Sequence, residues 1–208
     1  MSELFRYLQT RLLRWQIALL WAVLIATLLV SVGTIGSPAA QLTQSVLLLV
    51  AILVFRLWDD LADREHDRLR HPERVLVKAQ DLTQFIVVLV AGLLSAAFLL
   101  RGDVRQLLVY LGLVALLAVL YHSPLEKVLT RSARSGLVLL KYPLFVSLLV
   151  TPSFRAWLAG IGLYVLLLVY EWRDDPDLRE AAPLPLLAAA AAGIAIISAL
   201  YWFAGALT

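Results

Sequence analysis

The chain has 208 residues, of which 62% are hydrophobic; its formal net charge is +3, and it contains no cysteine. Soluble domains are about 45–50% apolar on a similar count, so this composition excludes an ordinary soluble protein and predicts an integral membrane protein. The lack of cysteine excludes disulfides and thiolate chemistry. A basic chain can bind nucleic acid, but in a membrane protein the distribution of charge matters more than its sum, and we expect no nucleic-acid partner.

The predicted elements begin with a retained first helix. The N-terminal stretch MSELFRYLQTRLLRW is no obvious signal peptide, because the apolar run after it is long and lacks a clear cleavage site. A transmembrane helix needs about 20 mostly apolar residues. Seven segments qualify, at residues 16–36, 42–58, 83–101, 105–121, 136–152, 156–171 and 184–205. We therefore predict an all-α, polytopic transmembrane helix bundle of about seven spans, in a single domain over residues 1–208.

Two of these segments have a distinctive composition. Pro143 interrupts the fifth, which a membrane helix tolerates where neighbours satisfy the freed backbone groups. The last, LPLLAAAAAGIAIISALYWFAGA, is rich in Ala and Gly. Small residues favour close helix packing in lipid, so we expect this helix to lie tightly against its neighbours.

Charge is sorted between the two sides of the predicted bundle. Fourteen of the 18 Lys and Arg residues lie at the N-terminus or after spans two, four and six, which places these parts in the cytoplasm by the positive-inside rule. Fourteen of the 15 acidic residues lie there too, although that rule does not sort acids. We therefore expect a cytoplasmic site, with Asp-rich loops at about residues 59–82 and 171–183, in a bacterial-type inner or plasma membrane.

The first acidic cluster follows the second span, in the stretch RLWDDLADREHD. Asp60, Asp63 and Asp67 recur at three- and four-residue spacing, so they share one face if the helix continues, and Asp59 can flank them. Like charges stacked in this way repel and need compensation. Mg²⁺, which commonly binds one or two carboxylates together with substrate phosphates, would supply it.

The arginines of the same stretch allow two interpretations. Arg56, Arg64 and Arg68 can pair with the aspartates, as in a solvated loop helix, or they can bind a phosphate group directly. A second acidic patch lies at the end of span six, in LYVLLLVYEWRDDPDLRE. Two such patches favour a diphosphate-binding site over a salt-bridged loop helix. Two such clusters facing each other would hold two or more Mg²⁺ ions with a diphosphate between them.

Three further residues can contribute to such a site. Tyr121 ends span four, and Lys127 follows in the loop; alternatively, they are an interfacial anchor and a positive-inside charge. Lys141 lies inside the fifth predicted span, where an ionisable residue is a functional candidate, although its long side chain can also snorkel to the surface.

The first cluster, Asp59-Asp60-x-x-Asp63-x-x-x-Asp67, resembles the NDxxDxxxD motif of the UbiA-type intramembrane prenyltransferases. The downstream RHPER resembles the tail that often follows this motif, YHSPLEK resembles a segment of the family's middle loop, and YEWRDDPD resembles its second motif, DxxxD. The order of the motifs agrees over roughly residues 16–180. The departures are an Asp in place of the first Asn and a Glu in place of the first Asp of the second motif.

The resemblance implies Mg²⁺-dependent transfer of an isoprenyl group from a polyprenyl diphosphate to a lipophilic or aromatic acceptor within the membrane. The implied metal ligands are Asp59, Asp60, Asp63, Asp67, Glu171, Asp174 and Asp175. Catalytic roles are implied for Asp63, Asp67, Tyr121 and Lys127. Contacts to the diphosphate are implied for Arg56, Arg64, Arg68, Lys127 and Lys141. The expected partners are the isoprenyl diphosphate donor, a hydrophobic acceptor and membrane lipid.

Other functions remain open on the sequence. The family typically has nine spans, so a bundle of about seven would need a homodimer or another membrane subunit to close it, or would serve as a non-catalytic lipid-diphosphate-binding or assembly protein. Phosphoribosyl transfer to a polyprenyl phosphate would use the same metal site. A CDP-alcohol phosphotransferase is disfavoured because DDLADREHDRLR lacks the glycine of that signature. A transporter is disfavoured because only Lys141 comes near the bilayer midplane.

Overall fold

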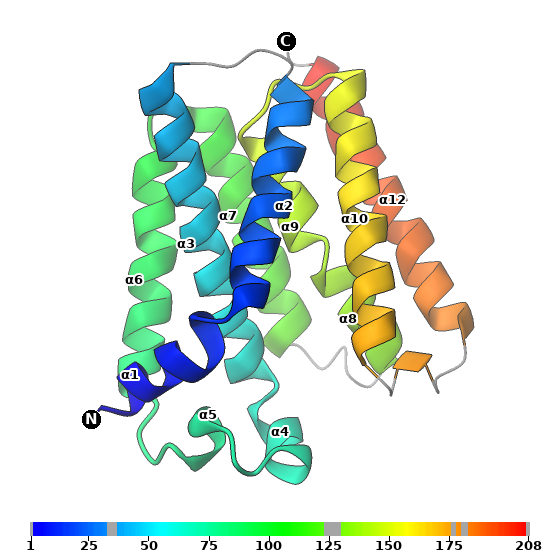
Figure 1. The fold of residues 1–208 in the computed structure, drawn as a ribbon. Helices are drawn as coiled ribbons and strands as arrows, with labels where there is room; N and C mark the ends of the chain where they lie inside the picture. The colour runs from blue at the N-terminus through cyan, green and yellow to red at the C-terminus, as the bar shows by residue number, and fades with distance from the viewer. Residues whose placement is uncertain (1, 33–36, 123–129, 176–177, 180–182, 207–208) are drawn as a thin grey trace. The chain divides into compact units, whose positions relative to one another are not determined.

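The structure, a computed structural model, describes residues 2–32, 37–122, 130–175, 178–179 and 183–206 (Figure 1). Over these residues the chain is helical and contains no β-strand. Six helices in this described part are long and apolar enough to cross a membrane: Trp15–Val32, Pro38–Ala62, Thr83–Leu100, Val104–His122, Phe154–Asp174 and Pro183–Trp202. The prediction of an all-helical chain is confirmed, and the six apolar helices are compatible with an integral membrane protein.

The fifth predicted segment, residues 136–152, differs from the expectation of one continuous span. It is divided between α8 (Arg131–Val138) and α9 (Lys141–Leu148), with a turn at residues 139 and 140. Pro143 explains the break, since it has no N–H for the carbonyl of Leu139 and its ring would collide with that carbonyl in a continuous helix. The proline occupies the first turn of α9, where no such bond is required.

The chain falls into two compact units. The first comprises Met1–Val23 with Pro38–Leu107, and the second comprises Leu24–Ser37 with Leu108–Thr208. The helices α2 (Trp15–Val32) and α7 (Val104–His122) contribute residues to both units.

The first unit is built on the long helix α3, which packs along α6. Its other elements are two short N-terminal helices and two short helices between α3 and α6. The bounds are α1 (Glu3–Tyr7), the π-helix η1 (Leu8–Leu12), α3 (Pro38–Ala62), α4 (Arg64–Arg70), α5 (Val75–Lys78) and α6 (Thr83–Leu100). Gly92 allows α6 to approach α3 closely, because a Cβ there would lie 2.3 Å from Cγ2 of Val54.

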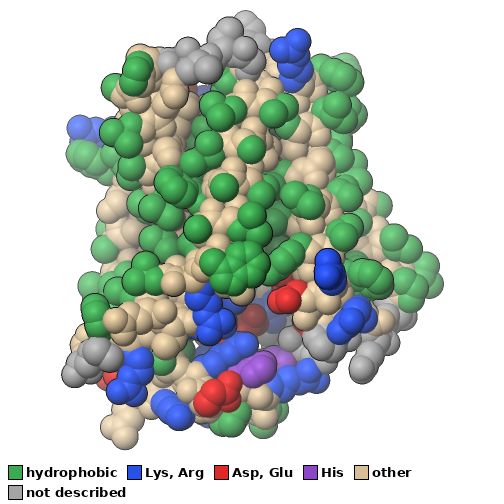
Figure 2. Space-filling model, viewed as in Figure 1, with side chains coloured by type: hydrophobic (Ala, Val, Ile, Leu, Met, Phe, Trp, Pro, Cys, Tyr) green, Lys and Arg blue, Asp and Glu red, His purple; other side chains and the backbone are tan. Residues whose placement is uncertain are grey.

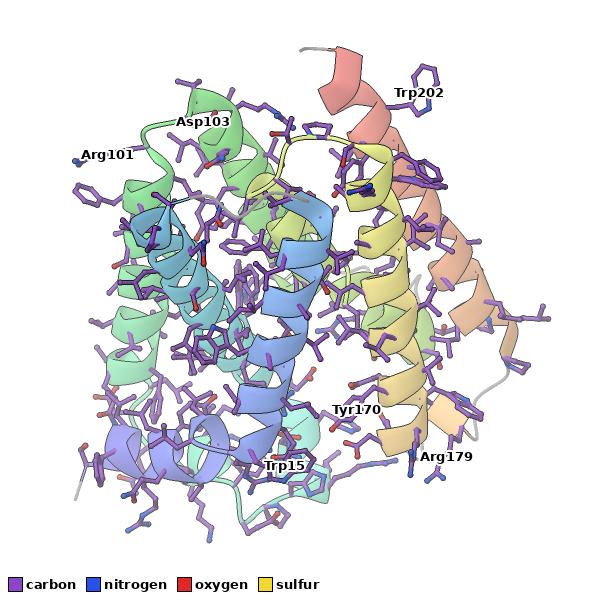
Figure 3. All side chains as sticks on the ribbon, turned by 45° about the horizontal axis from the view of Figure 1, so that its top comes forward. Trp15, Arg101, Asp103, Tyr170, Arg179 and Trp202 are labelled. Atoms are coloured by element: carbon purple, nitrogen blue, oxygen red, sulfur yellow. The ribbon has the colours of Figure 1, made fainter. Side chains whose placement is uncertain are left out.

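The short helices of the first unit lie together at one end of α3 and α6. In Figure 1, α1, α4 and α5 surround the end where α3 finishes and α6 begins, and α1 packs against α5. Figure 2 shows apolar side chains over the helices of this unit and charged side chains gathered at the end where the short helices lie. Figure 3 places Trp15 at that end and Arg101 and Asp103 at the opposite one. Within the first unit, the connection between α3 and α6 and the connection that follows α6 therefore lie at opposite ends (Figure 1 and Figure 3).

The second unit is held together by α12 (Pro183–Ala206), which packs against α8 and against α10 (Phe154–Asp174). Gly193 of α12 makes room for the ring of Tyr164, since a Cβ there would lie 2.4 Å from the ring. The Tyr164 hydroxyl lies 3.0 Å from the carbonyl oxygen of Gly136 and 3.1 Å from that of Ala189. A small residue thus permits the close packing that the composition of the last span predicted.

Candidate functional site

A buried carboxylate lies in the last turn of α3. Asp60 is 6% exposed and forms a bidentate ion pair with Arg11, with Nη2 donating to Oδ1 at 2.7 Å and Nε donating to Oδ2 at 3.1 Å. The hydroxyl of Tyr7 donates to Oδ2 at 2.8 Å, and Nε of Arg56 lies 3.7 Å from Oδ1. Both carboxylate oxygens are therefore engaged by the chain's own donors, in the strongest geometry that an arginine offers.

The N-terminal segment reaches this carboxylate because of its local structure. Ser2 caps α1 by accepting a hydrogen bond from the N–H of Phe5. The chain continues directly from α1 into the π-helix η1, so residues 3–12 are helical without a break. Tyr7 and Arg11 are four residues apart, so they lie on the same face of this segment. That face is turned inward: Tyr7 is 1% exposed, and its ring packs edge-on against Phe85 at a centroid distance of 5.6 Å.

Tyr7 acts as a neutral hydrogen-bond donor in this arrangement. Burial of the phenol raises the pKa of Tyr7 far above its ordinary value, and the negative charge of Asp60, which accepts its hydrogen bond, raises it further. Arg56 and Arg11 act in the opposite direction but do not outweigh these effects. The phenol therefore keeps its proton at physiological pH and beyond.

A second buried carboxylate follows in α4. Asp67 is 5% exposed and is paired with Arg74, which directly precedes α5. Arg64 stabilises the same region differently: its Nε and Nη2 each donate, at 2.9 Å, to the backbone carbonyls of Leu76 and Ala79. The connection between α3 and α6 is thus held by two arginines, one on a carboxylate and one on the backbone.

The four aspartates predicted to share a site have different environments. Asp60 and Asp67 are buried, Asp59 is half-buried, and Asp63 is exposed. The backbone N–H of Asp63 donates to the carbonyl of Asp59, and that of Asp67 donates to the carbonyl of Asp63, so helical bonding runs through the junction of α3 and α4 as expected. Asp63 is nonetheless exposed, so Asp60, Asp63 and Asp67 do not share one buried face.

The aspartates predicted to bind Mg²⁺ are not arranged as a metal site in this structure. Among the residues that the structure describes, no group of three or more acidic or histidine side chains is arranged to hold a metal ion. Asp60 and Asp67 each have arginine as their counter-ion instead. In this arrangement Mg²⁺ could use these two carboxylates only after the arginines had moved, and a Mg²⁺ site remains a prediction.

The three arginines expected to bind a diphosphate also have different partners and different exposure. Arg56 lies beside Asp60 with 40% of its side chain exposed, so one side of it can reach a ligand. Arg64 is committed to backbone carbonyls, and Arg68 pairs with Glu65 at 3.1 Å in an exposed position. Of these three, Arg56 has the position best suited to the expected role.

The second unit contains a buried lysine–tyrosine pair. Lys141 begins α9, is 1% exposed, and donates from Nζ to the hydroxyl of Tyr121 at 3.3 Å. Its ammonium group also lies 5.2 Å from the centroid of the Tyr142 ring. The side chain has therefore not snorkelled to the surface but is held inside the protein. Lys127 lies outside the described residues.

The second acidic cluster lies at the C-terminal end of α10. Glu171 and Asp175 are half-buried and Asp174 is exposed. The N–H of Asp175 donates to the carbonyl of Glu171 at 2.9 Å and closes the helix. Figure 3 shows Tyr170 and Arg179 at this end of the unit and Trp202 at the other. This cluster and that of Asp60 belong to different units, and the expectation that they face each other remains a prediction.

Sequence reasoning missed three residues of the first unit: Tyr7, Arg11 and Arg74. On the sequence, the first two belong to the N-terminal stretch before the first span, where Arg11 counts only as a positive-inside charge. Their spacing of four residues was the one local signal that they act together. Arg74 belongs to the RHPER stretch, but the sequence did not indicate which acid it would meet.

Comparison with protein-family models, with curated proteins and with solved structures finds no match to this chain. The class that the structure defines is that of an all-helical chain with six candidate membrane-spanning helices among its described residues. Its candidate site is the charged cluster around Asp60 and Asp67 at one end of the first unit.

Proposed function

We propose that this protein is a membrane-embedded transferase that moves an isoprenyl group from a polyprenyl diphosphate to a hydrophobic acceptor. One observation carries the proposal: a buried carboxylate and two guanidinium groups, Arg11 and Arg56, meet at the end of the apolar helix α3. A lipid diphosphate likewise combines an apolar part with a charged end, since it has an apolar tail and a small, highly charged headgroup. Its tail would lie among the apolar helices, and its headgroup would meet the charged end.

The arginines supply the anion-binding chemistry that this proposal needs. A guanidinium group is planar and always charged, and it binds phosphate oxygens through two parallel hydrogen bonds. Arg56 and Arg11 offer this chemistry within a few ångströms of each other, because both contact Asp60. The roles proposed for Tyr121, Lys127 and Lys141 do not depend on this pair of arginines.

The proposed reaction is a substitution at an allylic carbon. The C–O bond to the diphosphate breaks, and its electron pair leaves with the diphosphate. A nucleophilic atom of the acceptor forms the new bond to that carbon and releases a proton. Positive charge around the leaving group lowers the barrier. Mg²⁺ would supply more of it if Asp59, Asp60, Asp63 and Asp67 held the ion after the arginines on Asp60 and Asp67 had moved.

A second candidate is a non-catalytic protein that binds lipid diphosphates. The observation that favours it is that, among the residues that the structure describes, both buried aspartates are paired with arginine. Such a protein needs cationic groups to hold the headgroup but needs no means of activating a leaving group. It would bind the same lipid without releasing diphosphate.

Binding of geranylgeranyl diphosphate to the detergent-purified full chain, with and without Mg²⁺, tests both candidates. The transferase predicts Mg²⁺-dependent binding that is lost in Asp63→Asn and Asp67→Asn, with release of diphosphate when an acceptor mixture is added. Asp103→Asn is the matched control, since Asp103 lies at the opposite end of the first unit. Binding without Mg²⁺ dependence or release would favour the non-catalytic candidate, and no binding would contradict both.

A further inference from the structure

We propose that the N-terminal segment, residues 2–12, is a displaceable strap over the candidate site and that Arg11 exchanges between Asp60 and the phosphate of the bound headgroup. This inference rests on the proposed function, because it identifies how a diphosphate enters that site and which residue receives it. The headgroup would not bind to an open pocket; it would compete with a carboxylate for a guanidinium group.

The contacts of the segment lead to this proposal. Residues of α1 and η1 cover Asp60 with two side chains, Tyr7 and Arg11, that together engage both of its oxygens. The same segment packs against α5, close to the connection that carries the Asp67–Arg74 pair. A headgroup that takes Arg11 must therefore compete with Asp60 for the guanidinium group and loosen the contact of this segment with α3.

The energetics permit the exchange because Asp60 has a second cation. Separating a buried ion pair is costly when it leaves a charge without a partner. If Arg11 turns to a phosphate group, however, Arg56 is 3.7 Å from Oδ1 and can neutralise Asp60 in its place. Arg11 in turn gains a phosphate, whose oxygens match the guanidinium fork as well as a carboxylate does. Each charge keeps a partner before and after the exchange.

The strap is also short and partly exposed. It consists of two five-residue helices, and short segments of this kind open locally at low cost compared with global unfolding. Leu12 is 5% exposed at its end, whereas the next residue, Leu13, is 76% exposed. Leu12 is the last residue of the strap and is buried, and Leu13 directly after it is exposed, so the two positions form a pair for measuring displacement of the strap.

The experiment uses the lack of cysteine in the chain. Leu12→Cys and Leu13→Cys are made separately in the full-length protein, and the rate of labelling by a water-soluble maleimide is measured in detergent. The probes are inorganic pyrophosphate with MgCl₂, geranylgeranyl diphosphate with MgCl₂, and MgCl₂ alone. Because opening limits the reaction of a buried thiol, we expect pyrophosphate and the lipid to accelerate labelling at position 12 about tenfold and to leave position 13 unchanged.

Asp60→Asn in the Leu12→Cys background gives the effect of releasing the strap without ligand. We expect it to accelerate labelling at position 12 as the lipid does, while Asp103→Asn has no effect. Direct binding of the lipid is measured on the same protein. Lipid binding without faster labelling would overturn the strap but leave the proposed function intact. Acceleration by pyrophosphate without any lipid binding would retain the strap and reject the isoprenyl donor.

Wild-type protein provides a second measurement that does not depend on a folded cysteine variant. Trypsin cleaves a segment only after its backbone has left the helical conformation, so cleavage after Arg6, an exposed arginine of the strap, should be slow while the strap is closed and faster when pyrophosphate is added. Arg101, which is exposed at the opposite end of the first unit (Figure 3), is the internal control in the same digest. Equal cleavage after Arg6 with and without pyrophosphate, together with unchanged labelling at position 12, would refute the strap.

Discussion

Arg11 and Asp60 are 49 residues apart in the sequence, yet the two nitrogens of the guanidinium fork lie 2.7 and 3.1 Å from the two carboxylate oxygens. This pair connects the N-terminal segment to the end of α3, the helix that leads into the acidic stretch. It also explains how a chain with aspartates at consecutive helical turns avoids their mutual repulsion: each buried acid has an arginine from another element.

The Arg11–Asp60 pair should contribute strongly to stability. Breaking a buried ion pair is costly where a charge is left without a partner. Asp60→Asn removes the carboxylate that both Arg11 and Arg56 face, whereas after Arg11→Gln Asp60 still has Arg56. We therefore expect Asp60→Asn to lower the thermal midpoint in detergent clearly and Arg11→Gln to lower it less, whereas Arg6→Gln, at an exposed position of the same segment, should leave it nearly unchanged. The double variant should lose less than the sum of the two single losses. Additive losses would show that the two side chains do not interact.

Tyr7 should stabilise the fold in a way that disappears at alkaline pH. Its pKa is raised in the folded protein, so above about pH 10 the unfolded state loses the phenolic proton while the folded state retains it. Stability therefore falls as the pH rises beyond that value. We expect Tyr7→Phe to flatten this fall in thermal midpoints measured from pH 8 to pH 11 and to remove one late-titrating phenol at 295 nm. Tyr170→Phe, at an exposed position, is the control; an equal effect of both variants would contradict the prediction.

Gly193 should be intolerant of a side chain. A Cβ at this position would lie 2.4 Å from the Tyr164 ring, whose hydroxyl is held by two backbone carbonyl groups, so the ring cannot easily move away. Overpacking of this kind costs about 1–3 kcal/mol. We expect Gly193→Ala to lower the thermal midpoint.

The matched control for Gly193 is Gly162→Ala on α10. A Cβ there has no neighbour within 4 Å, so the substitution should be neutral or stabilising through helix propensity. Combining Gly193→Ala with Tyr164→Leu, which shortens the colliding side chain, should recover part of the loss. A Gly193→Ala variant as stable as Gly162→Ala would show that α12 does not pack so closely on α10.

Arg64 should be needed to stabilise the connection between α3 and α6, which contains α4 and α5, rather than to bind a ligand. Its guanidinium group makes two hydrogen bonds to the carbonyls that end α5, and a hydrogen bond to a charged group contributes about 1.5–3 kcal/mol. We expect Arg64→Lys to destabilise this connection, seen as faster amide hydrogen exchange in α4 and α5. Arg68→Lys, in an exposed pair with Glu65, should leave exchange there unchanged. A loss of ligand binding without faster exchange would instead support a direct contact to phosphate.

The helical segments could largely be predicted from the sequence, because hydropathy is a local property. Six of the seven predicted segments correspond to long apolar helices, and the remaining one, residues 136–152, is divided just before Pro143. The proline was noticed in the sequence, but whether it would kink a span or divide it depends on the groups available to satisfy the freed carbonyl. That choice is made by neighbouring structure rather than by the proline.

The sequence by itself determined that the chain is helical and apolar, and that acids and bases collect in a few connections. It also showed that aspartates at helical spacing must be compensated. Only the tertiary structure decided which arginines meet the two buried aspartates, because those arginines come from other elements of the fold. Arg11 reaches Asp60 across 49 residues, and Arg74 reaches Asp67 from the start of α5. An ion pair depends on which side chains the fold brings within a few ångströms, and no local pattern contains that information.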